Sequence, residues 1–266
     1  MYYCVSLGRH DKRYRVAMTK FFIILLLCIQ STAALSNSIT QPLVGSHNEW
    51  PPYIFADGTG MTTELVRAAF FSQNIAFDIK IAPFSRAMRM LENNEIDLIP
   101  ALWWTENRAK TILFSQPYFT NELSIISNTK SQLDYQGPHS LESLTISTIR
   151  GYGYHEYLQS IDRLTIVPLL NVHSCLEHVK KHRADIALVD KYAAWFEMKK
   201  NGYSTELTIW QPALIKHPLH IGISKEHPNA EYIITSFNKG LEQIKRSGEY
   251  DEILARYEHL ASAQPE

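Results

Sequence analysis

The feature that most limits how this chain can fold is an alternation of short apolar segments with amphipathic ones, which occurs twice. The first round has strand patterns at 41–47, 77–83 and 96–102 and helix patterns at 58–74 and 84–95. The second has strand patterns at 144–151, 164–170 and 184–190 and helix patterns at 154–161, 172–183 and 191–202. This rhythm predicts parallel βαβ units, and hence an α/β fold of two lobes. Clefts between lobes are common ligand sites.

Residue types at the segment ends support these helices. Thr62 or Thr63 can cap the first helix, and Ser85 stands at the start of the second. Gly202 can end the helix of 191–202, because glycine accepts the left-handed conformation that closes a helix. A strand pattern at 219–228 and two further helix patterns, at 229–248 and 250–260, complete the chain.

The first residues have the order of a secretory signal. A basic stretch at 9–20 precedes an apolar run at 21–30, and small residues follow it. We expect a cleavable signal over residues 1–33, ending at Ala33. A retained anchor is disfavoured because the run is short, and lipidation of Cys28 is the weaker alternative. Met1 and Met18 both stay open as the start.

Export changes the charge balance. The presequence takes five of the 26 basic and one of the 27 acidic side chains, so the formal net charge moves from −1 to −5. Nothing in that balance indicates a nucleic-acid partner. Cys175 is then the one remaining cysteine, which excludes an internal disulfide. We expect a soluble monomer in the periplasm, with no metal and no cofactor.

Four segments in order resemble the extracytoplasmic solute-binding proteins of family 3, the amino-acid-binding type of ABC transporters. They are "WPPYIFADGTGMTTELVRAAF" at 50–70, "NNEIDLIPALWWTENRAKTILFSQPYF" at 93–119, "RADIALVDKYAAW" at 183–195 and residues 219–257. The resemblance implies the type II periplasmic-binding-protein fold, in which two hinge strands join two α/β lobes around a ligand cleft.

The same resemblance implies a domain division. Residues 34–124 and 222–266 would build lobe 1, and residues 125–221 would build lobe 2. The hinges would lie at "LSIISN" (123–128) and "LHIGIS" (219–224). The lobes would close on the ligand by a hinge motion.

Arg108 matches the family's carboxylate clamp. Thr105 can cap a short helix with Arg108 in its first turn, and a guanidinium offers two parallel donors to a carboxylate. Without the resemblance, a surface pair with Glu106 would be the better interpretation.

Asp190 ends an apolar strand, where a carboxylate faces the ligand crevice of an open α/β sheet. The resemblance assigns it the ligand's ammonium group. Capping of the helix that follows is a compatible alternative.

Aromatic and glycine residues complete the expected site. Trp50, Phe84, Trp103 and Tyr152 match cleft-lining positions, and Gly153 permits close backbone approach. Three positions depart from the family pattern. Trp103 and Tyr152 stand where a small hydroxyl residue is usual, and His47 stands where an acid is frequent.

These residues predict a non-enzymatic binding protein that captures a small carboxylate-bearing solute, an amino acid or a relative, for an ABC permease. Two alternatives stay open. One is a periplasmic dehydratase-like enzyme on the same fold, with His47, Glu64 or Asp190 as its acid. The other is a ligand-sensing partner of a membrane receptor.

Overall fold

A computed structural model describes residues 1, 41–131, 133–153, 155–159 and 161–261. The expected signal at 1–33 therefore lies, but for Met1, outside the described residues. Residues 39–266 form one compact unit, and the fold below is that of this unit. Among the described residues, no helix combines the length and the apolar character that crossing a lipid bilayer requires.

The first lobe begins with a parallel pair, β1 (Leu43–His47) and β2 (Phe77–Ile81). Helix α2 (Met61–Phe71) joins them, and α3 (Phe84–Glu92) leads on to β3 (Ile99–Trp103). A single 3₁₀ turn, η1 (Arg108–Lys110), precedes the short strand β4 (Ile112–Phe114). The strand–helix alternation predicted for this part of the chain is confirmed.

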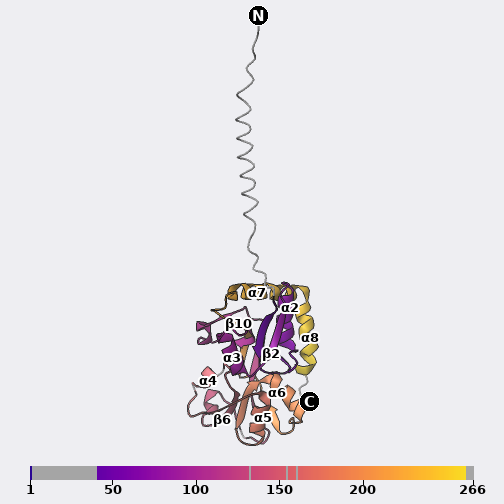
Figure 1. The fold of residues 1–266 in the computed structure, drawn as a ribbon. Coiled ribbons are helices and arrows are strands. Elements are labelled where there is room, and N and C mark those ends of the chain that lie inside the picture. The colour runs from indigo at the N-terminus through magenta and orange to yellow at the C-terminus, as the bar shows by residue number, and fades with distance from the viewer. Residues whose placement is uncertain (2–40, 132, 154, 160, 262–266) are drawn as a thin grey trace. The chain divides into compact units, whose positions relative to one another are not determined.

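The chain returns to the first lobe at its other end. Helices α7 (Ala230–Ser247) and α8 (Glu249–Ala261) both contact α2, and Figure 1 shows them in yellow beside the indigo α2. Phe70 and Phe237 meet in the α2–α7 contact, with ring centroids 5.5 Å apart. The lobe is thus assembled from segments far apart in the sequence.

The second lobe holds the second alternation. Its strands are β6 (Thr145–Ile149), β7 (Thr165–Leu169), β8 (Ile186–Asp190) and β9 (Leu207–Ile209). Its helices are α4 (His155–Leu158), α5 (Val172–Lys180) and α6 (Lys191–Asn201), and a 3₁₀ turn, η2 (Pro138–Leu141), precedes β6. Strand β6 pairs in parallel with both β7 and β8, as the βαβ pattern predicts.

Two long strands connect the lobes. β5 (Phe119–Asn128) and β10 (Ile215–Ser224) pair with each other, antiparallel, over Phe119–Leu123 and Ile215–Leu219. Beyond that stretch β5 pairs with β8 and β9, whereas β10 pairs with β3 and β4. One sheet in the order β3-β10-β5-β8-β6-β7 therefore runs through both lobes. The division at 124/125 and 221/222 stays a prediction.

The helix ends correct some expectations. Neither Thr62, Thr63 nor Ser85 caps its helix, because α2 starts at Met61 after Gly60 and α3 starts at Phe84 after Pro83, with no side-chain cap bond at either end. The expected stop at Gly202 is confirmed, and Gly248 ends α7 in the same left-handed conformation.

Candidate functional site

One pocket gathers all the residues that the sequence assigned to ligand binding. It is lined by His47, Trp50, Phe84, Ala101, Trp103, Arg108, Asn121, Leu123, Tyr152, Gly153, Asp190 and Leu219. Several stand at the carboxyl ends of strands: His47 ends β1, Trp103 ends β3 and Asp190 ends β8. All three line this pocket, and the carboxyl ends of strands are where open α/β folds bind ligands. Their roles in binding stay a prediction.

The cavity between these side chains is narrow. Its volume is about 20 Å³, which has room for a water molecule or two. An amino-acid-sized solute needs many times that space. The lobes or their side chains must therefore move apart before such a solute can enter.

Aromatic rings from both lobes fill most of the pocket. The first lobe supplies Trp50, Phe84 and His47, the last with its ring centroid 5.1 Å from that of Phe84. Tyr152 enters from the loop after β6 and packs 5.0 Å from Phe84 and 6.0 Å from Trp50. Its hydroxyl group contacts Asn48 Oδ1 at 3.2 Å. A ring of the second lobe thus sits among three rings of the first.

Trp103 lies apart from that cluster. Its ring stacks on His217 at 4.2 Å, and its Nε1 donates to Asn121 Oδ1 at 2.6 Å. The neighbouring Trp104 is 48% exposed and does not line the pocket. The indole of Trp103 therefore takes up volume that a small hydroxyl side chain would leave open.

The guanidinium of Arg108 reaches across the pocket. Nη1 donates to the carbonyl of Trp103 at 3.0 Å, and Nη2 donates to the carbonyl of Gly151 in the other lobe at 2.8 Å. Its central carbon lies 5.6 Å from the Phe84 ring centroid. Both bonds go to backbone carbonyls, which a ligand carboxylate can replace with a charge-assisted pair of bonds.

Two glycines let the loop after β6 approach this arginine. A Cβ atom at Gly153 would lie 3.2 Å from Arg108 Nη1 and 3.4 Å from Trp103 Cβ. Gly151 has a φ of 81°, a conformation that side chains rarely adopt. The Gly-x-Gly motif therefore permits a close contact between the lobes.

Asp190 is the buried acid of the site. Its Oδ1 accepts the N–H of Ala193, which is the predicted helix cap and is confirmed. Its Oδ2 accepts the Tyr53 hydroxyl at 3.1 Å and the Asn121 amide at 3.2 Å. Burial outweighs these donors and raises the pKa of Asp190 to about 6.

His47 is the buried base of the site, only 1% exposed. Nδ1 lies 3.0 Å from the Asn48 carbonyl, and Nε2 lies 3.2 Å from the Ala101 carbonyl. A neutral imidazole has one N–H, so only one of these contacts can be a hydrogen bond. Burial, opposed by the two carbonyls, lowers the pKa of His47 to about 4, so the ring is neutral at physiological pH.

Sequence reasoning missed several residues that build the pocket. Asn121 links Trp103 to Asp190, and Tyr53 connects the first lobe to Asp190. Leu123 and Leu219 of the connecting strands line the wall, with Ala101. Leu123 and Leu219 could have been found from the strand patterns of the hinge segments, because hinge strands border the cleft.

Two local expectations were wrong. Arg108 opens a 3₁₀ turn of three residues rather than a helix, although Thr105 Oγ1 accepts its N–H at 3.2 Å. Helix α4, after the Gly-x-Gly motif, has only four residues. Turns this short supply little helix dipole, so any anion here depends on the arginine side chain.

Known proteins are similar to this chain in sequence and in fold. The model of the bacterial extracellular solute-binding proteins, family 3, matches residues 43–259. The chain belongs to this family. Its fold is the type II periplasmic-binding-protein fold, so the resemblance seen in the sequence is confirmed.

The family's relatives are remote in sequence. A probable histidine-binding protein of Campylobacter jejuni is 21% identical, over 92% of this chain and 96% of its own. An arginine-binding periplasmic protein of Mannheimia haemolytica is 22% identical, over 90% and 98%. A histidine kinase sensor domain with similarity to periplasmic binding proteins superimposes with a TM-score of 0.73, at 21% identity over 82% of this chain and 96% of its own.

Proposed function

We propose that this family 3 protein captures a small carboxylate-bearing solute, an amino acid or a close relative, between its two lobes. Arg108 holds the carboxylate and Asp190 lies near the ammonium group. The observation that carries the proposal is the meeting of these two opposite charges, from different lobes, in one aromatic pocket. The names of the histidine- and arginine-binding relatives support the same class of solute.

The pocket is built for binding rather than catalysis. Of the three acids that an enzyme on this fold could use, Glu64 is paired with Arg256 and Tyr257 away from the pocket. Asp190 is engaged by a helix cap and by two side chains. His47 is neutral and buried against backbone carbonyls. These engagements support binding over catalysis.

The cellular setting follows from the family and the presequence. We propose that the chain is exported to the periplasm after cleavage at Ala33 and acts there as a monomer. It hands its solute to an ABC permease. Partnership with a membrane sensor is the alternative, which the sensor-domain similarity favours. Permease and ATPase genes beside the gene for this protein would support the transport role.

Titration calorimetry on Arg108→Ala and Arg108→Lys tests the carboxylate clamp. Truncating one partner of a buried charged pair costs on the order of 2–5 kcal/mol of binding. Each ~1.4 kcal/mol is tenfold, so Arg108→Ala should bind tens- to thousands-fold more weakly. Arg108→Lys should also bind poorly, because an ammonium cannot reproduce the guanidinium's paired donors.

Arg246→Ala is the matched control, because Arg246 is exposed on α7 and pairs only within its own helix. The solute is the best amino or organic acid from a thermal-shift screen, which works because a bound solute raises the melting temperature. Unchanged affinity in Arg108→Ala, with normal melting curves, would exclude the clamp.

A further inference from the structure

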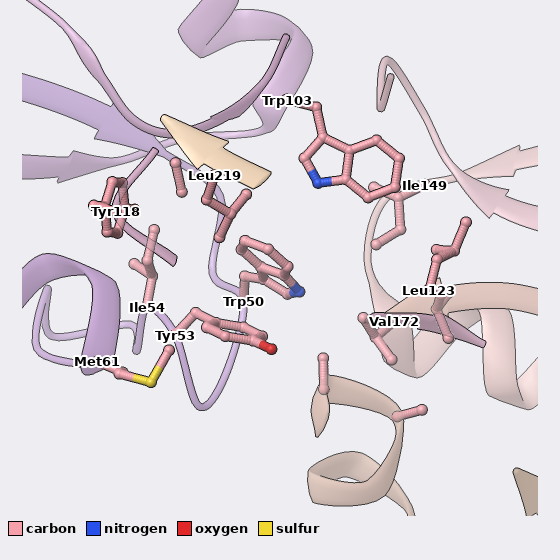
Figure 2. Packing of buried hydrophobic residues seen from close by; sticks show 14 of the residues in the cluster. Trp50, Tyr53, Ile54, Met61, Trp103, Tyr118, Leu123, Ile149, Val172 and Leu219 are labelled. Atoms are coloured by element: carbon pink, nitrogen blue, oxygen red, sulfur yellow. The ribbon is translucent and has the colours of Figure 1, made fainter. Parts of the chain in front are cut away.

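The indole N–H of Trp50 is a buried donor that has no acceptor among the residues that the structure describes. Trp50 is only 3% exposed and lines the pocket. Its Nε1 makes no hydrogen bond to any described residue. Figure 2 shows this nitrogen turned away from Ile54 and Met61 of the first lobe, towards the side of Leu123 and Val172.

Such an atom is costly unless something occupies the pocket. A buried donor without a partner costs about 1–3 kcal/mol, and buried polar groups in folded proteins are nearly always satisfied. The other indole of the site follows that rule, since Trp103 Nε1 donates to Asn121. The exception lies in the ligand pocket, where a solute can supply the acceptor.

The pocket also lacks an acid for a second cationic group. Asp190 is the only acid among the described residues that line it. A carboxylate has about four acceptor positions, and the side chains of Tyr53 and Asn121 and the N–H group of Ala193 already bond to this one. The acceptor position that is left is needed by the solute's ammonium group.

An anionic side chain has no better partner. Arg108 is assigned to the first carboxylate. His47 is neutral at physiological pH, because burial lowers its pKa. A second carboxylate would contact only aromatic rings and one N–H. That single hydrogen bond does not offset the free-energy cost of removing the charge from water.

We infer that the solute's side chain is uncharged and ends in a hydrogen-bond acceptor that Trp50 Nε1–H receives, as a carboxamide oxygen would. This inference rests on the proposed function, because it takes the carboxylate to be held by Arg108. The two donors have different neighbours in the pocket. Arg108 lies over Phe84, whereas Trp50 packs on Tyr53 at 4.3 Å, and Tyr53 bonds to Asp190. Trp50 is then a specificity-determining residue.

The assignment separates this chain from its arginine-binding relative. Guanidinium and ammonium side chains only donate, so they cannot accept from an indole N–H, and they need acids that this pocket does not supply. An aliphatic side chain fits the rings but leaves the N–H unpaired. A site built to make a hydrogen bond discriminates strongly against analogues that cannot make it.

Calorimetry with four amino acids tests the inference. L-Glutamine carries the amide, L-leucine is a neutral analogue without the acceptor, and L-arginine and L-glutamate carry opposite charges. We expect wild-type protein to bind glutamine at least tenfold more tightly than each of the others. Trp50→Phe keeps an aromatic ring but removes the N–H. It should therefore lower the affinity for glutamine about tenfold and change the affinity for leucine by no more than about twofold.

Trp104→Phe is the matched control, because Trp104 is exposed beside the site but outside the pocket lining. It should not change either affinity. An equal loss of glutamine and leucine in Trp50→Phe would reduce Trp50 to packing and overturn the inference. So would wild-type protein that binds arginine, glutamate or leucine as tightly as glutamine, a result that needs no variant and leaves the proposed function intact. If none of the four binds, both the inference and the amino-acid proposal fail.

Discussion

At the scale of single residues, His47 and Asp190 are two buried titratable groups of one pocket whose pKa values are shifted in opposite directions. Burial raises the pKa of Asp190 from 3.8 to about 6 and lowers that of His47 from 6.5 to about 4. Because its pKa is raised, the Asp190 carboxyl group stabilises the folded protein below about pH 4, and this stabilisation is lost as the pH rises through 6. Because its pKa is lowered, the His47 imidazole stabilises the folded protein above pH 6.5, and this stabilisation is lost as the pH falls through 4. Each contribution is about 3 kcal/mol.

Because the two contributions oppose each other over the same range, they largely cancel between pH 4 and 6.5. We expect single variants to reveal them. Compared with wild type, melting temperatures of Asp190→Asn should rise more steeply with pH over this range, because the opposing aspartate contribution is removed. Compared with wild type, those of His47→Phe should shift towards a fall with pH, because the opposing histidine contribution is removed. Melting curves at half-unit steps measure both slopes, and two variants with parallel slopes would contradict the assignment.

The sequence identified eight of the residues that line the pocket but not their partners. Arg108, Asp190 and the aromatic residues belong to recognisable motifs, and all of them line the pocket. The links from Tyr53 and Asn121 to Asp190 join residues 137 and 69 positions apart. Such contacts depend on tertiary packing, which no local pattern encodes. For the same reason, the sequence does not show that Trp50 Nε1 lacks a hydrogen-bond partner among the described residues.

At the scale of elements, the long periodic segments were predicted and the short ones were not. Helix α7 follows its apolar periodicity and ends at Gly248, and α6 ends at Gly202, as predicted. The three-residue strands β4 and β9 are too short to show alternation, and only their pairing with β10 and β5 defines them. The local sequence pattern determines secondary structure where a helix has several turns or a strand several residue pairs. In shorter segments, pairing with neighbouring strands determines it.

The contact between α2 and α7 gives an element-scale prediction at Gly240. A Cβ atom there would lie 1.9 Å from the carbonyl oxygen of Ala69 in α2. Glycine to alanine in a helix normally adds about 1 kcal/mol of stability. Here overpacking against a backbone costs more than that, by roughly 2–3 kcal/mol net. We expect Gly240→Ala to lower the melting temperature by about 5–10 °C.

Thr235→Ala on the exposed face of α7 is its control, and it should change stability by no more than about 0.5 kcal/mol. A melting temperature of Gly240→Ala at or above that of Thr235→Ala would show that the two helices can separate without cost.

At the scale of the whole molecule, two connecting strands and a few bonds set how the lobes meet. β5 and β10 pair with each other before each continues into one lobe, so their pairing can flex while the sheets on either side persist. Bonds that hold the lobes together around the pocket include those of Arg108 to Gly151, Tyr152 to Asn48 and Tyr53 to Asp190. A cavity of about 20 Å³ cannot admit an amino acid in this arrangement.

Entry of the solute therefore depends on the fraction of molecules in which these bonds are open, and Tyr152→Phe should raise that fraction. The variant keeps the ring but loses the bond to Asn48, which is worth about 0.5–1.5 kcal/mol. Association then accelerates about two- to tenfold, because the rate scales with the binding-competent population. Stopped-flow tryptophan fluorescence measures it, since Trp50 and Trp103 line the pocket. Tyr250→Phe, which loses a hydroxyl bond to Tyr118 at 2.7 Å within the first lobe, should leave the rate unchanged. Equal association rates in Tyr152→Phe and wild type would mean that the lobes open without breaking this bond.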